Sequence, residues 1–115
     1  MPYVQVRVSV PLTKEQIEKL AAETLESINL IPGKSAPVTM TEIVPDCNLY
    51  FGSVDGTPCA IVDVAANNSP DSADLKAYSK HVCKALNEIA DIELHRIYVK
   101  HHGNPEWHTG RMFIE

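Results

Sequence analysis

The first ten residues, MPYVQVRVSV, constrain the fold more than any other stretch of the chain. Valine occupies every second position from Val4 to Val10, and mostly polar residues occupy the positions between. Successive side chains of a β-strand point to opposite faces, so this pattern predicts a strand with one apolar face. Chain ends fray unless other elements hold them. The sequence therefore predicts a sheet in which the N-terminal strand is firmly held.

A helix and a second strand follow. The run from Lys14 to Asn29 has apolar side chains at helical spacing, and Thr13 with Gln16 has the T-x-x-Q form of a capping box. The IPGK segment, residues 31–34, ends the helix because neither proline nor glycine continues it comfortably. Beyond it, the stretch from Val38 to Val44 is rich in β-branched residues and predicts a strand.

The second half of the chain repeats this order. A nearly continuous apolar strand from Cys59 to Ala66 comes first, and a capped amphipathic helix follows within residues 67–90. An alternating strand from Ile97 to His101 and a short apolar end at Met112 to Ile114 complete the half. The repeated order predicts an α+β fold, in which two βαβ units form a four-stranded sheet covered by two helices. No linker separates the halves, so residues 1–115 are expected to be a single domain.

One face of the predicted sheet indicates that the chain associates with further subunits. Two helices cover only one face, and the mixture of Thr39, Thr41 and Ile43 expected on the other face is neither fully polar nor fully apolar. Small domains commonly hide such a face, and their sheet edges, in closed cyclic assemblies. We therefore expect association with further subunits.

Composition excludes several classes of protein. The net charge is −5 and the ten Lys and Arg residues are spread singly, so no basic stripe is present for nucleic acid. The three cysteines form no C-x-x-C pair and no secretory signal precedes them, which fits a reducing cytoplasm. No apolar run approaches the roughly 18 residues of a membrane span. A soluble, cytoplasmic protein without nucleic-acid or membrane partners is expected.

Pro2 has two interpretations. Proline is tolerated at the first position of a strand, so Pro2 can simply begin it. An initiator methionine before a small residue is generally removed, however, and removal would leave the proline nitrogen as a free secondary amine. Such an amine can take up a proton or attack a carbonyl, whereas proline within a chain is a tertiary amide without a donor.

Five short motifs together resemble one family. They are MP-x-V at the start, IPGK after the first helix, then L-Y-F-G, P-C-A and R-I-Y-V-K, and they occur in the family's order over nearly the whole chain. With the length of 115 residues, the chain is similar to the tautomerase superfamily with an amino-terminal proline. Within it, the macrophage migration inhibitory factor branch, including bacterial phenylpyruvate tautomerase-like members, is the best match. The resemblance implies the same sandwich of two βαβ units, assembled as a homotrimer.

The resemblance also implies roles for three residues. Pro2 matches the catalytic amine, which as a base moves a proton between carbon and oxygen in keto and enol forms. Lys34 matches a cationic residue that binds the substrate carboxylate, and its charge together with burial would lower the pKa of the amine. Tyr98 matches a tyrosine that the neighbouring subunit contributes to the pocket.

Three further pocket positions depart from, or only partly keep, the family pattern. Asn67 stands where relatives usually carry an apolar residue, so an amide would face the pocket. Lys100 replaces the family's asparagine two places after the tyrosine, as it often does in bacterial relatives. Trp107 is kept, whereas the second tryptophan of the usual ending is lost. The identity of the substrate therefore stays open.

The histidines indicate no metal site. His101 and His102 are neighbours on a predicted strand, so their side chains point to opposite faces and cannot readily share one metal ion. His108 follows Trp107 in the segment that closes the family's pocket, where a group titrating near neutrality could help proton transfer. An exposed loop histidine is the simpler interpretation of His108.

The leading hypothesis is an isomerase that interconverts keto and enol forms of phenylpyruvate-like 2-oxo acids without metal or organic cofactor. Pro2 would be the base and Lys34 the carboxylate anchor. An alternative within the enzymes is a lyase or dehalogenase relative that adds water, although the additional Arg and Glu groups of those branches are not placed here. A non-catalytic trimer that binds a protein or a small ligand is the alternative outside the enzymes, motivated by Asn67 and the altered ending.

Overall fold

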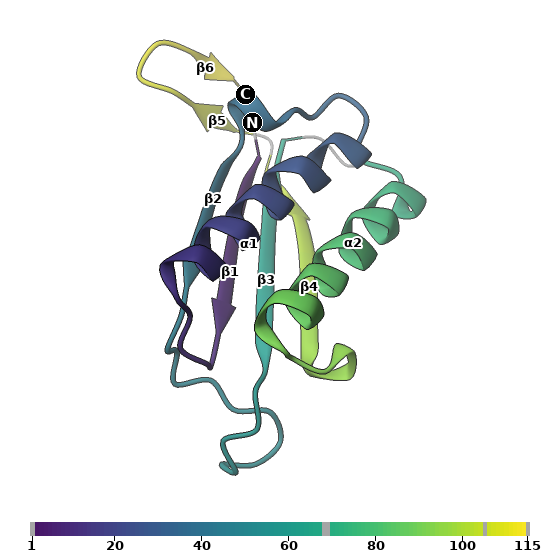
Figure 1. Ribbon diagram of the computed structural model, residues 1–115. Coiled ribbons are helices and arrows are strands. Elements are labelled where there is room, and N and C mark those ends of the chain that lie inside the picture. The colour runs from purple at the N-terminus through teal and green to yellow at the C-terminus, as the bar shows by residue number, and fades with distance from the viewer. Residues whose placement is uncertain (1, 68–69, 105, 115) are drawn as a thin grey trace.

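The computed structural model describes residues 2–67, 70–104 and 106–114, and its main elements follow the order strand, helix, strand twice (Figure 1). The first unit comprises β1 (Tyr3–Val8), α1 (Lys14–Ser27) and β2 (Met40–Val44). The second comprises β3 (Ala60–Ala66), α2 (Ser72–Ala90) and β4 (Ile97–Gly103). Three 3₁₀ turns are η1 (Ile28–Leu30), η2 (Ala36–Val38) and η3 (Leu94–Arg96). A terminal hairpin consists of β5 (Trp107–His108) and β6 (Phe113–Ile114).

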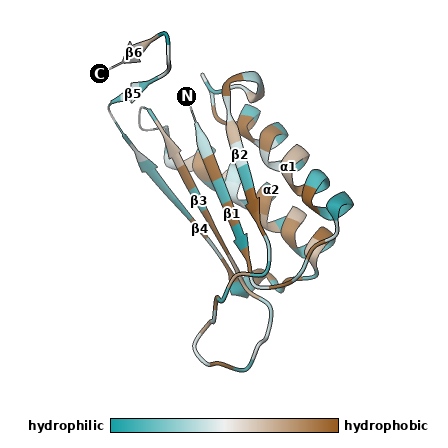
Figure 2. Ribbon diagram, turned by 90° about the vertical axis from the view of Figure 1, so that its left-hand side faces the viewer, coloured by the Kyte–Doolittle hydropathy of each residue, from teal (hydrophilic) through white to brown (hydrophobic). Residues whose placement is uncertain are grey.

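The four long strands form one sheet in the order β2-β1-β3-β4. β1 is parallel to β2, and β3 is parallel to β4, so each helix connects two parallel strands. The two units meet where β1 pairs with β3 in the antiparallel direction. Both helices cover the same face of the sheet, and the hairpin extends beyond the end where β1 begins (Figure 2). The predicted α+β fold of two βαβ units is confirmed.

The valine face of β1 lies at the centre of the core. Val4, Val6 and Val8 have no exposed surface, as the alternation predicts. Both helices and the following strand segments pack onto this face, and the buried residues that they contribute include Leu20, Ile28, Val62, Tyr78, Val82, Leu86 and Ile92. The core therefore depends on contacts between the two βαβ units.

A capping box fixes the start of α1, as the T-x-x-Q pattern predicts. The backbone N–H of Gln16 donates to the Thr13 hydroxyl over 3.1 Å, and the Thr13 N–H donates to Gln16 Oε1 over 2.8 Å. Gln16 also donates from Nε2 to the carbonyl of Ile89 over 3.0 Å, which joins the start of α1 to the end of α2. At the start of α2, Asp71 makes no side-chain cap bond, and its carbonyl accepts the Leu75 N–H over 3.1 Å.

The predicted composition of the uncovered sheet face is wrong. In the register of β1 and β2, Thr41 pairs with Val4 and Ile43 pairs with Val6, so both side chains lie on the helix-covered face. Thr39 lies between η2 and the strand. The strand begins two residues later than expected because the 3₁₀ turn η2 includes Val38.

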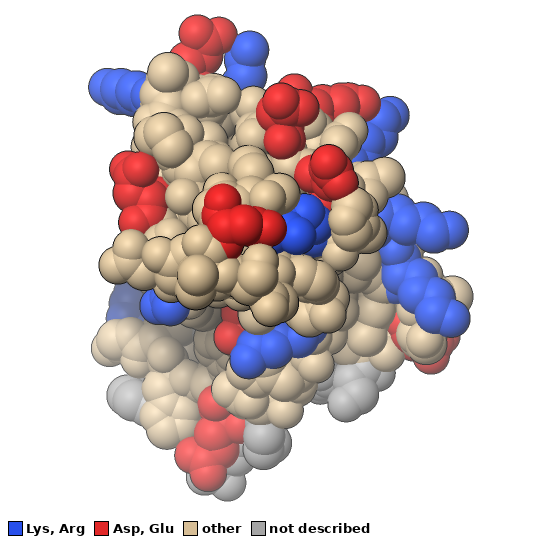
Figure 3. All heavy atoms as spheres, turned by 90° about the horizontal axis from the view of Figure 1, so that it is seen from below, with Lys and Arg blue, Asp and Glu red and all other residues tan. Residues whose placement is uncertain are grey.

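Paired polar side chains occupy much of that face. Glu42 accepts the Tyr3 hydroxyl over 2.9 Å and the Gln5 amide over 2.8 Å. Met40, in contrast, leaves 75% of its surface exposed at the end where β1 begins. At the opposite end of the molecule, acidic and basic side chains are interspersed (Figure 3). Within the described residues, neither helix combines the length and the apolar character that a membrane crossing requires.

Removing the capping box should destabilise the fold measurably. Thr13→Ala deletes the hydroxyl that accepts the Gln16 N–H, and the expected loss is about 1 kcal/mol of unfolding free energy. Urea unfolding followed by circular dichroism measures this loss. Thr13→Ser keeps the acceptor and is the matched control. A Thr13→Ala protein as stable as Thr13→Ser would contradict the capping assignment.

Candidate functional site

Pro2 lies at the end of the sheet where β1 begins, on the wall of a broad groove. The residue is buried, and its carbonyl accepts the Met40 N–H over 3.1 Å, which holds the segment against β2. The groove has a volume of about 800 Å³ and is formed by this strand end and the terminal hairpin. Its mostly apolar lining includes Val38, Met40, Ala65, Trp107 and Met112.

Trp107 contributes an unsatisfied donor to this groove. The indole is half-buried, and its Nε1 is buried without a hydrogen-bond partner in the described part of the chain. A buried donor without an acceptor is costly, so native proteins rarely keep one. A bound molecule or a neighbouring subunit could supply the acceptor. His108 lines the groove next to it, with Nε2 at 3.6 Å from the Glu106 carboxylate.

A carboxylate and two basic side chains form a cluster on the face away from the helices. Asp63 accepts a hydrogen bond from His102 Nε2 over 2.8 Å and lies 3.5 Å from Lys100 Nζ. Asp63 and His102 also line the groove, whereas Lys100 does not. The Asp63–His102 contact was missed from the sequence. Asp63 and His102 lie on the same face of adjacent strands, so the contact could be expected once β3 and β4 are known to be neighbours.

Lys34 reaches the end of β3 from the loop after η1. Gly33 has φ of +82°, a left-handed conformation that glycine adopts readily, in the turn that places Lys34. The ammonium group donates to the Asn67 carbonyl over 2.6 Å and to Asn67 Oδ1 over 3.0 Å. Burial lowers the pKa of Lys34. Two of the predicted site residues, Lys34 and Asn67, are therefore in direct contact.

Pro2 and the Lys34–Asn67 pair lie at the same end of the sheet. Tyr3 pairs with Ala65, so continuing the register places Pro2 beside Ala66, the residue before Asn67. Ala65 lines the groove of Pro2, and Ala66 lines a second, smaller pocket that contains Lys34. Both spaces therefore border this end of β3.

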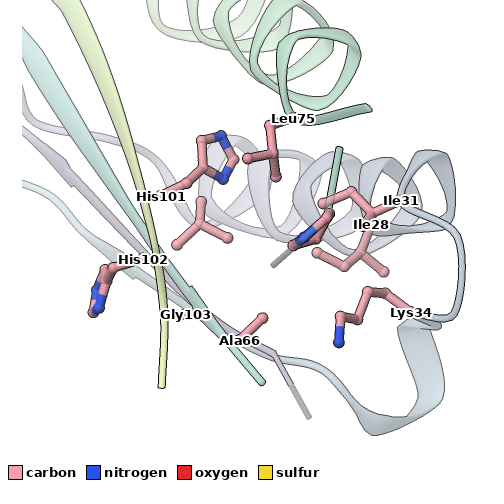
Figure 4. Close-up of a pocket in the computed structure, with 10 residues that line it drawn as sticks. Ile28, Ile31, Lys34, Ala66, Leu75, His101, His102 and Gly103 are labelled. Carbon is pink, nitrogen blue, oxygen red and sulfur yellow. The ribbon is translucent and has the colours of Figure 1, made fainter. Parts of the chain in front are cut away.

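The smaller pocket, of about 160 Å³, lies between the sheet and the helices (Figure 4). His101 points toward the helix layer while His102 points to the other side of β4, as expected for strand neighbours. Ser79 Oγ lies 2.9 Å from His101 Nε2, whereas His101 Nδ1 is buried and unpartnered among the residues that the structure describes. Burial lowers the pKa of His101. No group of three potential metal ligands occurs in residues 2–67, 70–104 and 106–114.

Tyr98 lies far from Pro2 within one chain. It is level with Ile61 and Arg7 in the sheet, five strand positions from Pro2, or roughly 17 Å at about 3.4 Å per residue. The residue is 60% exposed, and its ring packs edge-on against Phe51, with centroids 5.2 Å apart. One chain therefore does not bring Tyr98 and Pro2 together.

The half-buried His101 should make stability depend on pH. The pKa of His101 in the folded chain is below the ordinary 6.5, so in the interval between the two values the unfolded chain binds more protons. Stability should therefore fall as the pH falls from 6.5. Urea unfolding at pH 7.5 and 5.5 should give a larger loss for the wild type than for His101→Asn. Equal losses in the two proteins would contradict this origin.

Similarity to known proteins extends over almost the whole chain. The family model described as macrophage migration inhibitory factor (MIF) matches residues 1–112. Macrophage migration inhibitory factor of Meriones unguiculatus is 30% identical over 103 residues, which cover 89% of this chain and 87% of the relative.

Solved structures share the fold at lower identity. The crystal structure of Leishmania major MIF2 superposes with a TM-score of 0.89 at 22% identity, covering 99% of this chain and 97% of that chain. The homologue from Prochlorococcus marinus has a TM-score of 0.84 at 19% identity, with coverage of 98% and 99%. The family match over almost every residue, with the same arrangement of strands and helices, leads to one conclusion: the chain belongs to the MIF family of the tautomerase superfamily.

Proposed function

We propose that the chain is a keto–enol tautomerase of small 2-oxo acids that needs no cofactor and uses the nitrogen of Pro2 as general base. The observation that carries the proposal is the position of Pro2. It is a buried proline on the wall of a mostly apolar groove, one strand neighbour away from the pocket of Lys34. Removal of Met1 would turn its nitrogen into a secondary amine at the wall of this groove.

The proposed reaction moves one proton and leaves the carbon skeleton unchanged. In the direction of the ketone, the unprotonated amine accepts the proton of the enol O–H, the C2–O bond becomes a carbonyl, and the enol electron pair forms a C–H bond at C3 with the proton returned by the amine. No oxidant or co-reactant is required. An apolar site disfavours a charged amine and lowers its pKa, which brings a general base toward neutral pH.

The binding roles divide between one chain and its neighbours. An ammonium group has three N–H donors, and two of those of Lys34 go to Asn67, so the third would bind the substrate carboxylate. Asn67 would hold Lys34 in place, and the Trp107 indole N–H would donate to a substrate oxygen. We assign Tyr98 and Lys100 to the site of an adjacent subunit in a homotrimer, because Tyr98 is too far from Pro2 in its own chain. A cytoplasmic location completes the proposal.

One observation favours a second candidate, a non-catalytic trimeric binding protein of the same fold. Asn67 already occupies two donors of Lys34, which weakens the case for strong carboxylate capture. In that case 2-oxo acids would produce no turnover, although the groove and the pocket would remain able to bind ligands.

Changing the nitrogen of Pro2 should remove most of the activity. Pro2→Ala leaves a primary amine on an unconstrained residue in place of the secondary amine of the ring, and the ketonisation of enol-phenylpyruvate, followed by absorbance, should slow by about 10²- to 10⁴-fold. A variant with one alanine inserted before Pro2 keeps the ring but makes its nitrogen an amide, and it should be at least as impaired. Mass spectrometry must show that Met1 is absent from the active wild type. Full activity in the insertion variant would exclude Pro2 as the base.

Mixed subunits test the assignment of Tyr98. Pro2→Ala and Tyr98→Ala should each be impaired while remaining trimeric by light scattering. Dissociating and reassembling the two together should restore part of the activity, since some pockets would combine an intact Pro2 with an intact Tyr98. Each variant reassembled alone is the control. A mixture no more active than its components, or a fully active monomeric wild type, would contradict a shared site.

A further inference from the structure

The pocket beside Lys34 is a different space from the groove of Pro2. It lies between the sheet and the helices, whereas the groove lies between the strand end and the hairpin. Figure 4 shows Ile28, Ile31 and Leu75 directed into it from the helix layer, with Lys34 at one end and His101 at the other. Of the residues that line this pocket, the function proposed above uses only Lys34, as the group that binds the substrate carboxylate.

The walls of the pocket are aliphatic and well fixed. Ile28 and Ile31 are 1% and 2% exposed, so their side chains are anchored in the core, and Val64 is 3% exposed. The volume of about 160 Å³ is large enough for a small organic group. An aliphatic cavity of about 150 Å³ is known to hold benzene, so a group of about five or six carbon atoms fits by size.

The charge of the pocket comes from Lys34. Its ammonium group retains one N–H beyond the two bonded to Asn67. His102 also lines the pocket, but its Nε2 donates to Asp63 on the other side of β4. Burial lowers the pKa of His101 and keeps that ring uncharged near neutral pH. An aliphatic cavity with one cation at its end matches a molecule that has one anionic end and an alkyl body.

We propose that this pocket binds a compact aliphatic carboxylate of about five or six carbon atoms, with its carboxylate on Lys34 and its alkyl group against Ile28, Ile31 and Leu75. Binding itself does not depend on the proposed tautomerase activity. Its consequence does rest on that function: an acid held by Lys34 would compete with a 2-oxo acid for the same ammonium group. The pocket would thus make short aliphatic acids inhibitors of the enzyme.

Titration of the methyl-labelled full chain with 4-methylpentanoate tests the proposal by NMR. The methyl signals of Ile28, Ile31, Val64 and Leu75 should shift together with one dissociation constant. The uncharged 4-methylpentanamide should bind at least about tenfold more weakly, because it loses a hydrogen bond between charged groups. Acetate should bind roughly a hundredfold more weakly, since it lacks four carbons of buried alkyl surface.

Variants locate the same site independently. Lys34→Gln should weaken the binding of 4-methylpentanoate at least about tenfold. Lys80→Gln removes the same charge from an exposed position of α2 and should leave this binding unchanged. Leu75→Phe should fill the pocket and abolish binding. If Leu75→Phe alters the fold by circular dichroism, the ligand series and the two lysine variants still decide.

Three results would overturn the proposal. They are methyl shifts centred on Met40 and Met112 of the groove, equal binding of the acid and the amide, and the absence of any shift at the pocket methyl groups. Pro2→Ala separates this proposal from the proposed function, because it should bind 4-methylpentanoate as the wild type does while losing turnover. If 4-methylpentanoate binds but does not inhibit the turnover of a 2-oxo acid, the shared use of Lys34 is refuted, whereas the binding site in the pocket remains supported.

Discussion

The pairing of β1 with a strand on each side holds the two halves of the molecule together. β1 is parallel to β2 and antiparallel to β3, so it joins the two βαβ units into one sheet. Its three fully buried valines then form the surface onto which both helices pack. Because the bond from Met40 N–H to the Pro2 carbonyl extends this pairing, the N-terminal segment has a defined place at the sheet end.

The same strand end serves two spaces because neighbouring residues of a strand face opposite sides. On β3, Ala65 lines the groove and Ala66 lines the pocket. On the neighbouring strand β4, His102 lies on the groove side and His101 on the pocket side. Lys34 reaches this point from the loop after η1 and is held there by Asn67. Lys34 lines the pocket but not the groove, and its place at this strand end is our reason for proposing a link between carboxylate binding and proton transfer.

The groove side of the molecule has paired charged side chains next to exposed apolar side chains. Asp63 is paired with His102 and Lys100. In contrast, Val38, Met40 and Met112 are each more than half exposed. The Trp107 N–H lacks a partner among the described residues. Exposed apolar side chains that gather around a groove mark surfaces for ligands or other chains. Tyr98 is held away from Pro2 by the sheet register, and Arg96 lies 5.1 Å from the centre of the Phe51 ring against which Tyr98 packs. These features support the proposed contribution of an adjacent subunit.

The helices and strands could be predicted from the sequence, because periodicity and capping are local properties. The alternating valines, the Thr13–Gln16 box and the IPGK stop could be recognised without knowing any long-range contact. Opposite faces for His101 and His102 also followed from strand geometry alone. Three features could not be predicted, because each depends on strand order or loop path. They are the contact of Lys34 with Asn67, the pairing of Asp63 with His102 and the partial burial of His101. Thr41 and Ile43 were misplaced for a related reason: tertiary pairing with β1 decided which side of β2 meets the helices.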